Sequence, residues 1–146
     1  MIQLKIKMLD EGLQPPRYQH PGDAGLDLPS RIECVLNPGE RAMIPTGVAV
    51  AIPDGYCGFV MIRSGLAARH GIACVNSPGL IDSGYRGELT IIALNTDKRE
   101  PFTIRRGDRI AQLVIQRVEQ VRSVEVSELD SSSRGEGGFG STGVSD

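Results

Sequence analysis

Short apolar stretches, separated by turn residues, constrain the fold of this sequence more than any other feature. The turn signals at residues 37–39, 53–55, 77–79 and 106–108 each combine Gly with Pro or Asp. This spacing predicts an all-β protein, with a jelly-roll-like double sheet. The predicted strands span residues 2–8, 31–36, 41–52, 57–62, 72–75, 88–94, 101–104, 109–118 and 121–126.

Only residues 66–70 favour a helix, and they make barely one turn, so an all-β architecture is favoured over an α/β plan. The length of 146 residues fits a single domain. We place the β jelly-roll domain at residues 1–126. Residues 127–146 are rich in Gly and Ser and predict a flexible C-terminal arm.

The arm has two interpretations. Terminal segments of this composition are commonly disordered and without function. Arg134 and Phe139, however, add a cation and an aromatic face to several backbone N–H groups, a combination that suits a nucleotide. The Gly-x-Gly-x-x-Gly pattern at residues 135–140 is not a dinucleotide fingerprint, because no strand or helix is predicted around it.

Charge and cysteine content exclude several classes of function. A formal net charge of −2 makes genomic nucleic acid an unfavourable partner, and no run approaches membrane-spanning length. Cys34, Cys57 and Cys74 form no Cys-x-x-Cys pair, which favours a reducing cytoplasm over a disulfide framework. With only two histidines, a metal is expected to arrive with a ligand.

Residues 76–88 are the richest in chemistry and predict a hairpin that bears an amide, a carboxylate and a phenol. An Asp beside a turn is most often a turn former. Because Leu80 and Ile81 precede it, Asp82 is instead our candidate for a general base that activates water.

Two further segments predict anion or cation sites. Arg63 and Ser64 open the short helix, where Ser64 acts either as a helix N-cap or as a phosphate contact. Asp23 and Asp27 flank a glycine, and they either form a turn or hold the water shell of Mg²⁺. The Arg-Gly-Asp at residues 106–108 is best explained as a turn.

Five segments in this order resemble the five motifs of the trimeric deoxyuridine triphosphatases. They are residues 24–28, 63–65, 79–88, 106–112 and 134–143. The resemblance covers nearly the whole chain. It implies a jelly-roll subunit in a homotrimer, with active sites at subunit junctions that the C-terminal arm of another subunit closes.

The resemblance also implies an activity. The family hydrolyses dUTP to dUMP and pyrophosphate with Mg²⁺, through water that attacks the α-phosphorus. This reaction keeps uracil out of DNA and supplies dUMP for thymidylate synthesis. Asp82 corresponds to the carboxylate that activates the water, and Tyr85 to the ring that excludes ribonucleotides. Asp27 corresponds to the acid that holds magnesium-bound water in the outer coordination sphere.

The other family positions are substrate contacts. Arg63, Ser64, Gly65 and Gln112 correspond to phosphate contacts. Asn76, Gly79, Leu80, Ile81 and Thr90 correspond to the hairpin that reads uracil. Arg134, Phe139, Gly140, Ser141 and Thr142 correspond to the arm that covers the nucleotide.

Two other functions remain open at this stage. One is a deaminase related to deoxycytidine triphosphate deaminase, against which the Asp82 and Tyr85 pair and the Phe-bearing tail argue. The other is a catalytically weak nucleotide sensor, which would not need to keep Asp82. Gly84 stands where many relatives carry an acidic residue, and this departure loosens the hairpin without removing any chemistry.

Overall fold

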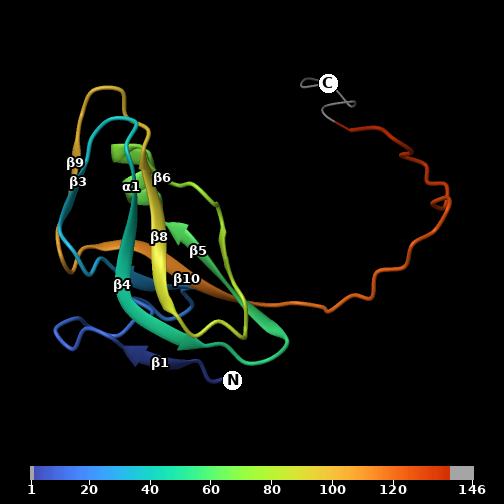
Figure 1. Cartoon of the computed structure of the whole chain (residues 1–146), viewed down its shortest axis with the longest axis horizontal. Coiled ribbons are helices and arrows are strands. Elements are labelled where there is room, and N and C mark those ends of the chain that lie inside the picture. Colours follow the sequence, from blue (N-terminus) through green and yellow to red (C-terminus); the bar gives the residue numbers. More distant parts are fainter. Residues whose placement is uncertain (1, 139–146) are drawn as a thin grey trace.

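The computed structural model describes residues 2–138, which form ten strands and one short helix (Figure 1). The strands are β1 (Lys5–Met8), β2 (Gly25–Pro29), β3 (Cys34–Leu36), β4 (Arg41–Ala51), β5 (Tyr56–Ile62), β6 (Ile72–Cys74), β7 (Gly79–Ile81), β8 (Glu88–Asn95), β9 (Phe102–Ile104) and β10 (Arg109–Arg117). The helix α1 spans Ser64–His70.

The strands form two four-stranded antiparallel sheets and a small pair. The first sheet has the order β1, β4, β8, β6, and the second has the order β2, β10, β5, β7. Strands β3 and β9 form the pair. The predicted all-β, jelly-roll-like fold is confirmed, with the third, two-stranded sheet as an addition.

The core lies between the two large sheets. Strand β8 alternates strictly between half-buried and buried positions, and its inward residues include Leu89, Ile91 and Ala93. They belong to one apolar cluster with Ile44 of β4 and Leu113 of β10. Burial of this alternating face is the main driving force that holds the sheets together.

Two polar side chains in the core have their partners. Asn95 is fully buried, and its amide donates to the backbone carbonyls of Leu36 and Glu100, both at 2.9 Å. The hydroxyl of Thr46 donates to the carbonyl of Leu89 at 2.7 Å. Beside it, Gly47 has a φ of +73° where the β4–β8 register shifts, a conformation that favours glycine.

Several sequence predictions need correction. Eight predicted strands correspond to observed ones, but residues 121–126 form no strand. Strands β2 and β7 were not among the predicted strands, and α1 begins at Ser64 instead of residue 66. The residue at the N-cap is Arg63, with no capping side-chain hydrogen bond, so Ser64 is not a cap.

The predicted hairpin at residues 76–88 is also wrong in one respect. Strand β7 pairs with β5 in one sheet, whereas β8 pairs with β4 and β6 in the other. The segment between them therefore connects two sheets and is not the tip of one hairpin. Its turn lies at Asp82–Tyr85, where the Tyr85 N–H donates to the Asp82 carbonyl at 3.1 Å.

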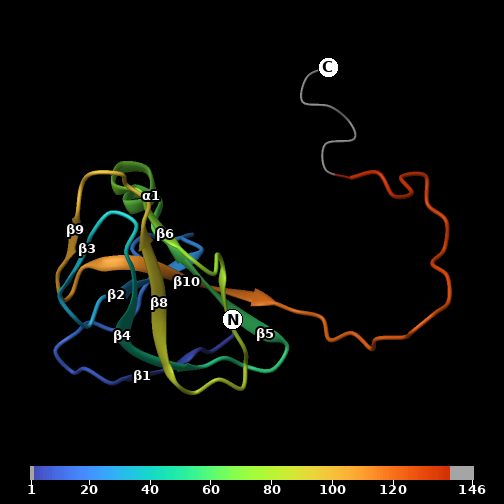
Figure 2. The same ribbon diagram turned by 45° about the horizontal axis from the view of Figure 1, so that its top comes forward.

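Beyond β10 the chain leaves the sheets, and residues 118–138 contain no helix or strand (Figures 1 and 2). No helix among residues 2–138 has the length and apolar character needed to cross a lipid bilayer.

Candidate functional site

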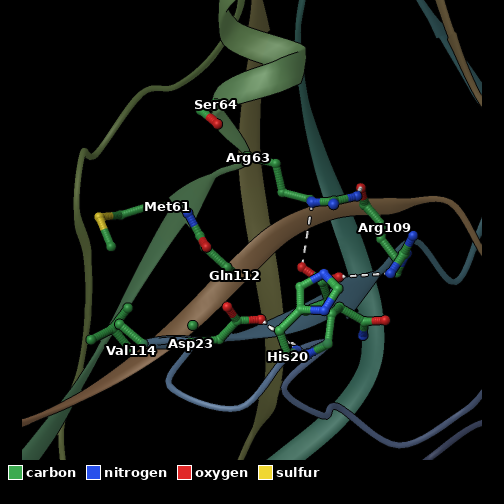
Figure 3. A pocket seen from close by; sticks show the side chains of 12 residues that line it. His20, Asp23, Met61, Arg63, Ser64, Arg109, Gln112 and Val114 are labelled. Carbon is green, nitrogen blue, oxygen red and sulfur yellow. Dashed lines mark hydrogen bonds and ion pairs between the residues drawn. The ribbon is translucent and has the colours of Figure 1, made fainter.

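A polar cavity of about 620 Å³ opens beside β10, β5 and the start of β2 (Figure 3). Its walls carry two carboxylates, those of Asp23 and Asp27, and two guanidinium groups, those of Arg63 and Arg109. The lining residues are Gln19, His20, Asp23, Ala24, Gly25, Asp27, Met61, Arg63, Ser64, Arg109, Gln112 and Val114.

Asp27 lies between two arginines at this cavity. Its side chain is only 9% exposed. Arg63 Nε lies 3.3 Å from Asp27 Oδ1, and Arg109 Nη1 donates to Asp27 Oδ2 at 3.0 Å, as the dashed lines from both arginines show (Figure 3). The Asp27 carboxylate and its two guanidinium partners together carry a charge of +1, which the Asp23 carboxylate on the same cavity wall balances. The guanidinium groups are nevertheless strong N–H donors for an anion.

Strand β10 brings these residues together because it pairs with two neighbours. Gln112 is in register with Asp27 of β2 on one side and with Met61 of β5 on the other. Arg63 follows the end of β5, and its backbone N–H donates to the carbonyl of Ile110 at 3.3 Å. Residues from three distant segments therefore share one face.

Glycine is required at residue 25, which pairs with Val114 and lies diagonally across from Gln112. A Cβ atom on Gly25 would lie 2.6 Å from Gln112 Oε1 and 3.0 Å from Gln112 Cβ. Any side chain at residue 25 would therefore push Gln112 from its place in the cavity wall.

The loop before β2 is shaped by Asp23. Its Oδ2 accepts the backbone N–H groups of Gln19 at 3.2 Å and of His20 at 2.8 Å. These two hydrogen bonds close the loop at residues 19–23, which agrees with the turn that was one of the two interpretations of Asp23. The turn places His20 at the cavity, as Figure 3 shows.

A smaller hollow of about 140 Å³ adjoins the large cavity at the start of α1. Arg63, Ser64, Gly65, Arg69 and Arg109 are among the residues that line it. The predicted phosphate-contact residues Arg63, Ser64, Gly65 and Gln112 are thus brought close to one another, together with Asp27.

The segment with Asp82 and Tyr85 lies elsewhere. Asp82 is exposed, and the Tyr85 hydroxyl donates to the carbonyl of Glu88 at 3.0 Å. The carboxylate of Glu88 in turn accepts the Gly47 N–H at 2.7 Å and pairs with Arg31 at 3.3 Å. These contacts fix the end of the segment against β4.

The ion-pair network continues from Arg31. Asp10 lies 3.9 Å from Arg31 and 2.6 Å from Arg106. The hydrogen bond from Arg106 holds the pKa of the Asp10 carboxyl below its ordinary value.

The predicted uracil-side residues lie on β7, just before it, and on β8. Gly79 is buried and Leu80 is exposed, while Ile81 and Thr90 are half-buried. Asn76 is exposed, and its side-chain oxygen accepts the thiol of Cys74 at 3.4 Å.

Strand register separates the two groups of residues within one chain. Ile81 is opposite Gly58 on β5, so Asp82 follows at the level of Cys57. Arg63 is six residues further along, or roughly 20 Å at the rise of an extended strand. Neither Asp82 nor Tyr85 lines the cavity that contains Arg63 and Asp27.

Comparison with known proteins identifies the family. The dUTPase family model matches residues 13–143 of this chain. This chain belongs to the dUTPase family.

Individual relatives of this chain carry the same family name. It is 59% identical over 142 residues to the deoxyuridine 5'-triphosphate nucleotidohydrolase of Thermobifida fusca, covering 97% of this chain and 79% of the relative. It is 57% identical to the Streptomyces griseus enzyme of the same name, with 97% and 81% covered.

Solved structures show the same fold. A variant dUTPase of Staphylococcus bacteriophage 80alpha, solved with dUpNHpp, has a TM-score of 0.90 at 34% identity. The match covers 99% of this chain and 100% of that one. A variant dUTPase of phage phi11 of S. aureus, described with a structural Mg(II) ion, has a TM-score of 0.82 at 32% identity, covering 89% and 100%.

The carboxylates of this dUTPase-family chain suit a cation held through water. Residues 2–138 contain no cluster of three or more His, Cys, Asp or Glu side chains that could hold a metal directly. Asp23 and Asp27 nevertheless line one cavity, and both oxygens of Asp27 already face guanidinium groups. Such a donor set fits Mg²⁺ that keeps its own waters and binds ligand phosphates.

The predicted arm residues are only partly described. Arg134 is exposed, and its Nε donates to the carbonyl of Gly137 at 2.8 Å, away from the cavity. Phe139, Gly140, Ser141 and Thr142 lie outside the described residues.

Some cavity residues were missed by the sequence reasoning. Gln19, His20, Met61, Arg109 and Val114 were not predicted as site residues. Of these residues, only Arg109 could have been found from the sequence, since it lies in the family segment at residues 106–112. Its pairing with Asp27, 82 residues away, depends on the β2–β10 register.

Proposed function

We propose that this chain hydrolyses dUTP to dUMP and pyrophosphate, and in doing so keeps uracil out of DNA and supplies dUMP for thymidylate synthesis. The observation that carries the proposal is the cavity in which Arg63 and Arg109 flank Asp27, on a chain whose residues 13–143 match the dUTPase family model. The close relatives are named for the same activity.

The cavity residues bind the triphosphate. Arg63 supplies a planar fork of N–H donors for phosphate oxygens, and Ser64 and Gln112 add neutral donors. Contacts with Asp27 and with the Arg109 carbonyl hold Arg63 before substrate arrives, so it can stabilise the charge that develops on the α-phosphate and on the leaving pyrophosphate. Bound Mg²⁺ would neutralise part of that charge, and Asp27 would hold one of its waters.

Asp82 is the general base. An aspartate carboxylate is ionised at neutral pH and accepts a proton from water as the water attacks the α-phosphorus. Asp82 is exposed on the connection between β7 and β8, which leaves it accessible to a substrate held by a second surface.

Tyr85 and the residues around β7 select the nucleoside. The Tyr85 ring packs against deoxyribose and excludes a 2'-hydroxyl, while Asn76, Gly79, Leu80, Ile81 and Thr90 read the uracil edge. Residues 127–146 form an arm beyond the jelly-roll domain, and Arg134, Phe139, Gly140, Ser141 and Thr142 close it over the nucleotide.

The complete site forms between chains of a homotrimer. The separation of roughly 20 Å between Asp82 and Arg63 along β5 supports this arrangement, because one dUTP cannot reach both residues within one chain. Exposed apolar side chains support it too. Val121, Val124 and Leu129 are 85%, 70% and 89% exposed, as expected of a segment that packs on another copy. We place the enzyme in the cytoplasm, which suits its three free thiols.

The test is a nucleotide panel with Mg²⁺. Pyrophosphate release is followed with dUTP, dCTP, dTTP and UTP, and ammonia is followed in parallel. We expect release from dUTP alone. Ammonia from dCTP would instead indicate a deaminase, and binding of dUTP without turnover would indicate a nucleotide sensor.

The base is tested by Asp82→Asn, which keeps the shape of the side chain. We expect dUTP binding to persist while kcat falls by roughly 10²-fold to 10⁴-fold. Full activity in Asp82→Asn would contradict the assignment of the base.

A further inference from the structure

We infer that Asp27 and Arg109 position the guanidinium of Arg63 for phosphate binding, so that Asp27 has a role that needs no metal. This inference rests on the proposed function and adds to it a positioning residue, Arg109.

The contacts form a chain that ends at Arg63. Arg109 Nη1 donates to Asp27 Oδ2 at 3.0 Å, and the other oxygen of Asp27 lies 3.3 Å from Arg63 Nε. Arg63 Nη1 also donates to the backbone carbonyl of Arg109 at 3.3 Å. Arg63 is thus held on two sides by one carboxylate and one carbonyl.

This arrangement fixes the direction of the Arg63 fork. A guanidinium has five N–H donors, and contacts at Nε and Nη1 orient its plane. Among residues 2–138 the remaining N–H groups of Arg63 have no hydrogen-bond partner, and Arg63 borders both the large cavity and the hollow at the start of α1. An oriented fork loses less conformational entropy when it binds phosphate.

Burial makes the Asp27 carboxylate a strong partner for the guanidinium groups of Arg63 and Arg109. The carboxylate is 9% exposed, whereas Arg63 and Arg109 are 38% and 49% exposed. A buried carboxylate is costly unless it is paired, so both arginines are drawn to it. Arg109 occupies Oδ2 and leaves Oδ1 to Arg63, which keeps the carboxylate in one orientation.

Positioning of Arg63 and simple electrostatics predict opposite effects of the Asp27 charge on anion affinity. Removal of one negative charge beside an anion site should tighten anion binding. If Asp27 instead holds Arg63 in place, Asp27→Asn should weaken anion binding, even when no metal is present.

The experiment measures the Kd of dUpNHpp by calorimetry in excess EDTA, with the full-length protein. We expect the Kd to rise roughly tenfold in Asp27→Asn and in Arg109→Gln, because each change frees Arg63 from its fixed orientation. Arg109→Lys, which can still pair with Asp27, should recover part of the loss. Arg117→Gln is the charge control, because Arg117 lies at the opposite end of β10 with 75% of its side chain exposed.

The double variant separates positioning from direct contact. If Arg109 acts through Asp27, adding Arg109→Gln to Asp27→Asn produces no further loss of affinity. An Asp27→Asn protein that binds as tightly as the wild type, or tighter, overturns the inference. An undiminished Arg109→Gln effect in the double variant overturns the role of Arg109. The Asp27→Asn result decides the sign even if Arg109→Gln does not fold.

Failure of the proposed function would look different. The wild-type protein would then show no dUTP turnover in Mg²⁺. The positioning of Arg63, in contrast, is tested by the Kd of dUpNHpp in EDTA.

Discussion

Tyr85 folds back over Gly87, and this contact sets the position of its ring. A Cβ on Gly87 would lie 2.6 Å from Tyr85 Cζ and 3.0 Å from Cε2. The hydroxyl of Tyr85 then reaches the carbonyl of Glu88 at 3.0 Å. The absence of a side chain at residue 87 is therefore part of how the ring is presented.

We expect Gly87→Ala to raise the KM for dUTP roughly threefold to tenfold, because the displaced ring loses a hydrogen bond worth about 1 kcal/mol. Turnover of UTP relative to dUTP should increase as the ring leaves the deoxyribose. Steady-state kinetics with both nucleotides measure these changes.

Gly84→Ala is the matched control, since a Cβ there has nothing within 4 Å. Tyr85→Phe removes only the hydroxyl and separates the hydrogen bond from the position of the ring. Unchanged selectivity in Gly87→Ala would show that the ring position does not govern sugar selection.

At the residue level, the sequence predicted individual groups better than their partners. The resemblance assigned Arg63, Ser64 and Gln112 to phosphate contacts and Asp27 to magnesium-bound water. The structure places all four at one cavity, and their roles stay predictions. The pairing of Asp27 with Arg109 could not be predicted, because it depends on the register of β2 against β10.

At the level of elements, the connection between β8 and β9 depends on Asp97. Its Oδ1 accepts the N–H groups of Arg99 at 2.8 Å and Glu100 at 2.9 Å. These backbone hydrogen bonds, of which that from Glu100 is the largest, lower the pKa of the Asp97 carboxyl.

A lowered pKa in the folded state gives a definite pH dependence. The stabilisation is complete above the ordinary aspartate pKa of 3.8 and is lost as the pH falls through the lower, folded value. We expect Asp97→Ala to lower the Tm at pH 7, and the difference from the wild type to narrow in increasingly acidic buffers below that value. Thermal scans at several pH values measure this; a constant difference would contradict the contribution of the charge.

The elements that were predicted wrongly share a physical cause. Residues 121–126 alternate like a strand, but within one chain they have no free sheet edge beside them and remain exposed. Residues 76–88 contain turn signals typical of a hairpin, yet β7 and β8 pair with different sheets. Local pattern predicts extended structure, whereas the choice of pairing partner is decided by the packing of the whole domain.

At the level of the whole molecule, we expect Asp82 and Arg63 of different chains to act on one substrate. Asp82→Asn and Arg63→Gln should each be inactive alone. When the two proteins are unfolded and refolded together in equal amounts, random assembly of trimers should restore about one quarter of the wild-type sites. The background activity is measured on the two variants refolded separately and mixed afterwards.

If both residues came from the same chain, co-refolding would produce no active site. That result would reject the assembly between chains and leave the assignment of each residue to be tested separately.

Removal of residues 134–146 tests the arm. We expect the truncated protein to keep its circular dichroism spectrum and Tm, because residues 118–138 contribute no strand to the sheets. Its kcat/KM for dUTP should fall strongly, since closure over the nucleotide is lost. A truncated protein that unfolds would instead show that this segment is structural.

The distance between Asp82 and Arg63 along β5 also affects how the rate depends on the amount of enzyme. If Asp82 and Arg63 of one chain cannot reach the same substrate molecule, a dissociated chain contributes no turnover. Activity per milligram should then decline on dilution, following the mass action of association, and substrate that bridges two chains should oppose that decline. The concentration of this protein in the cell would then determine both the number of chains and the fraction of them that are assembled into active sites.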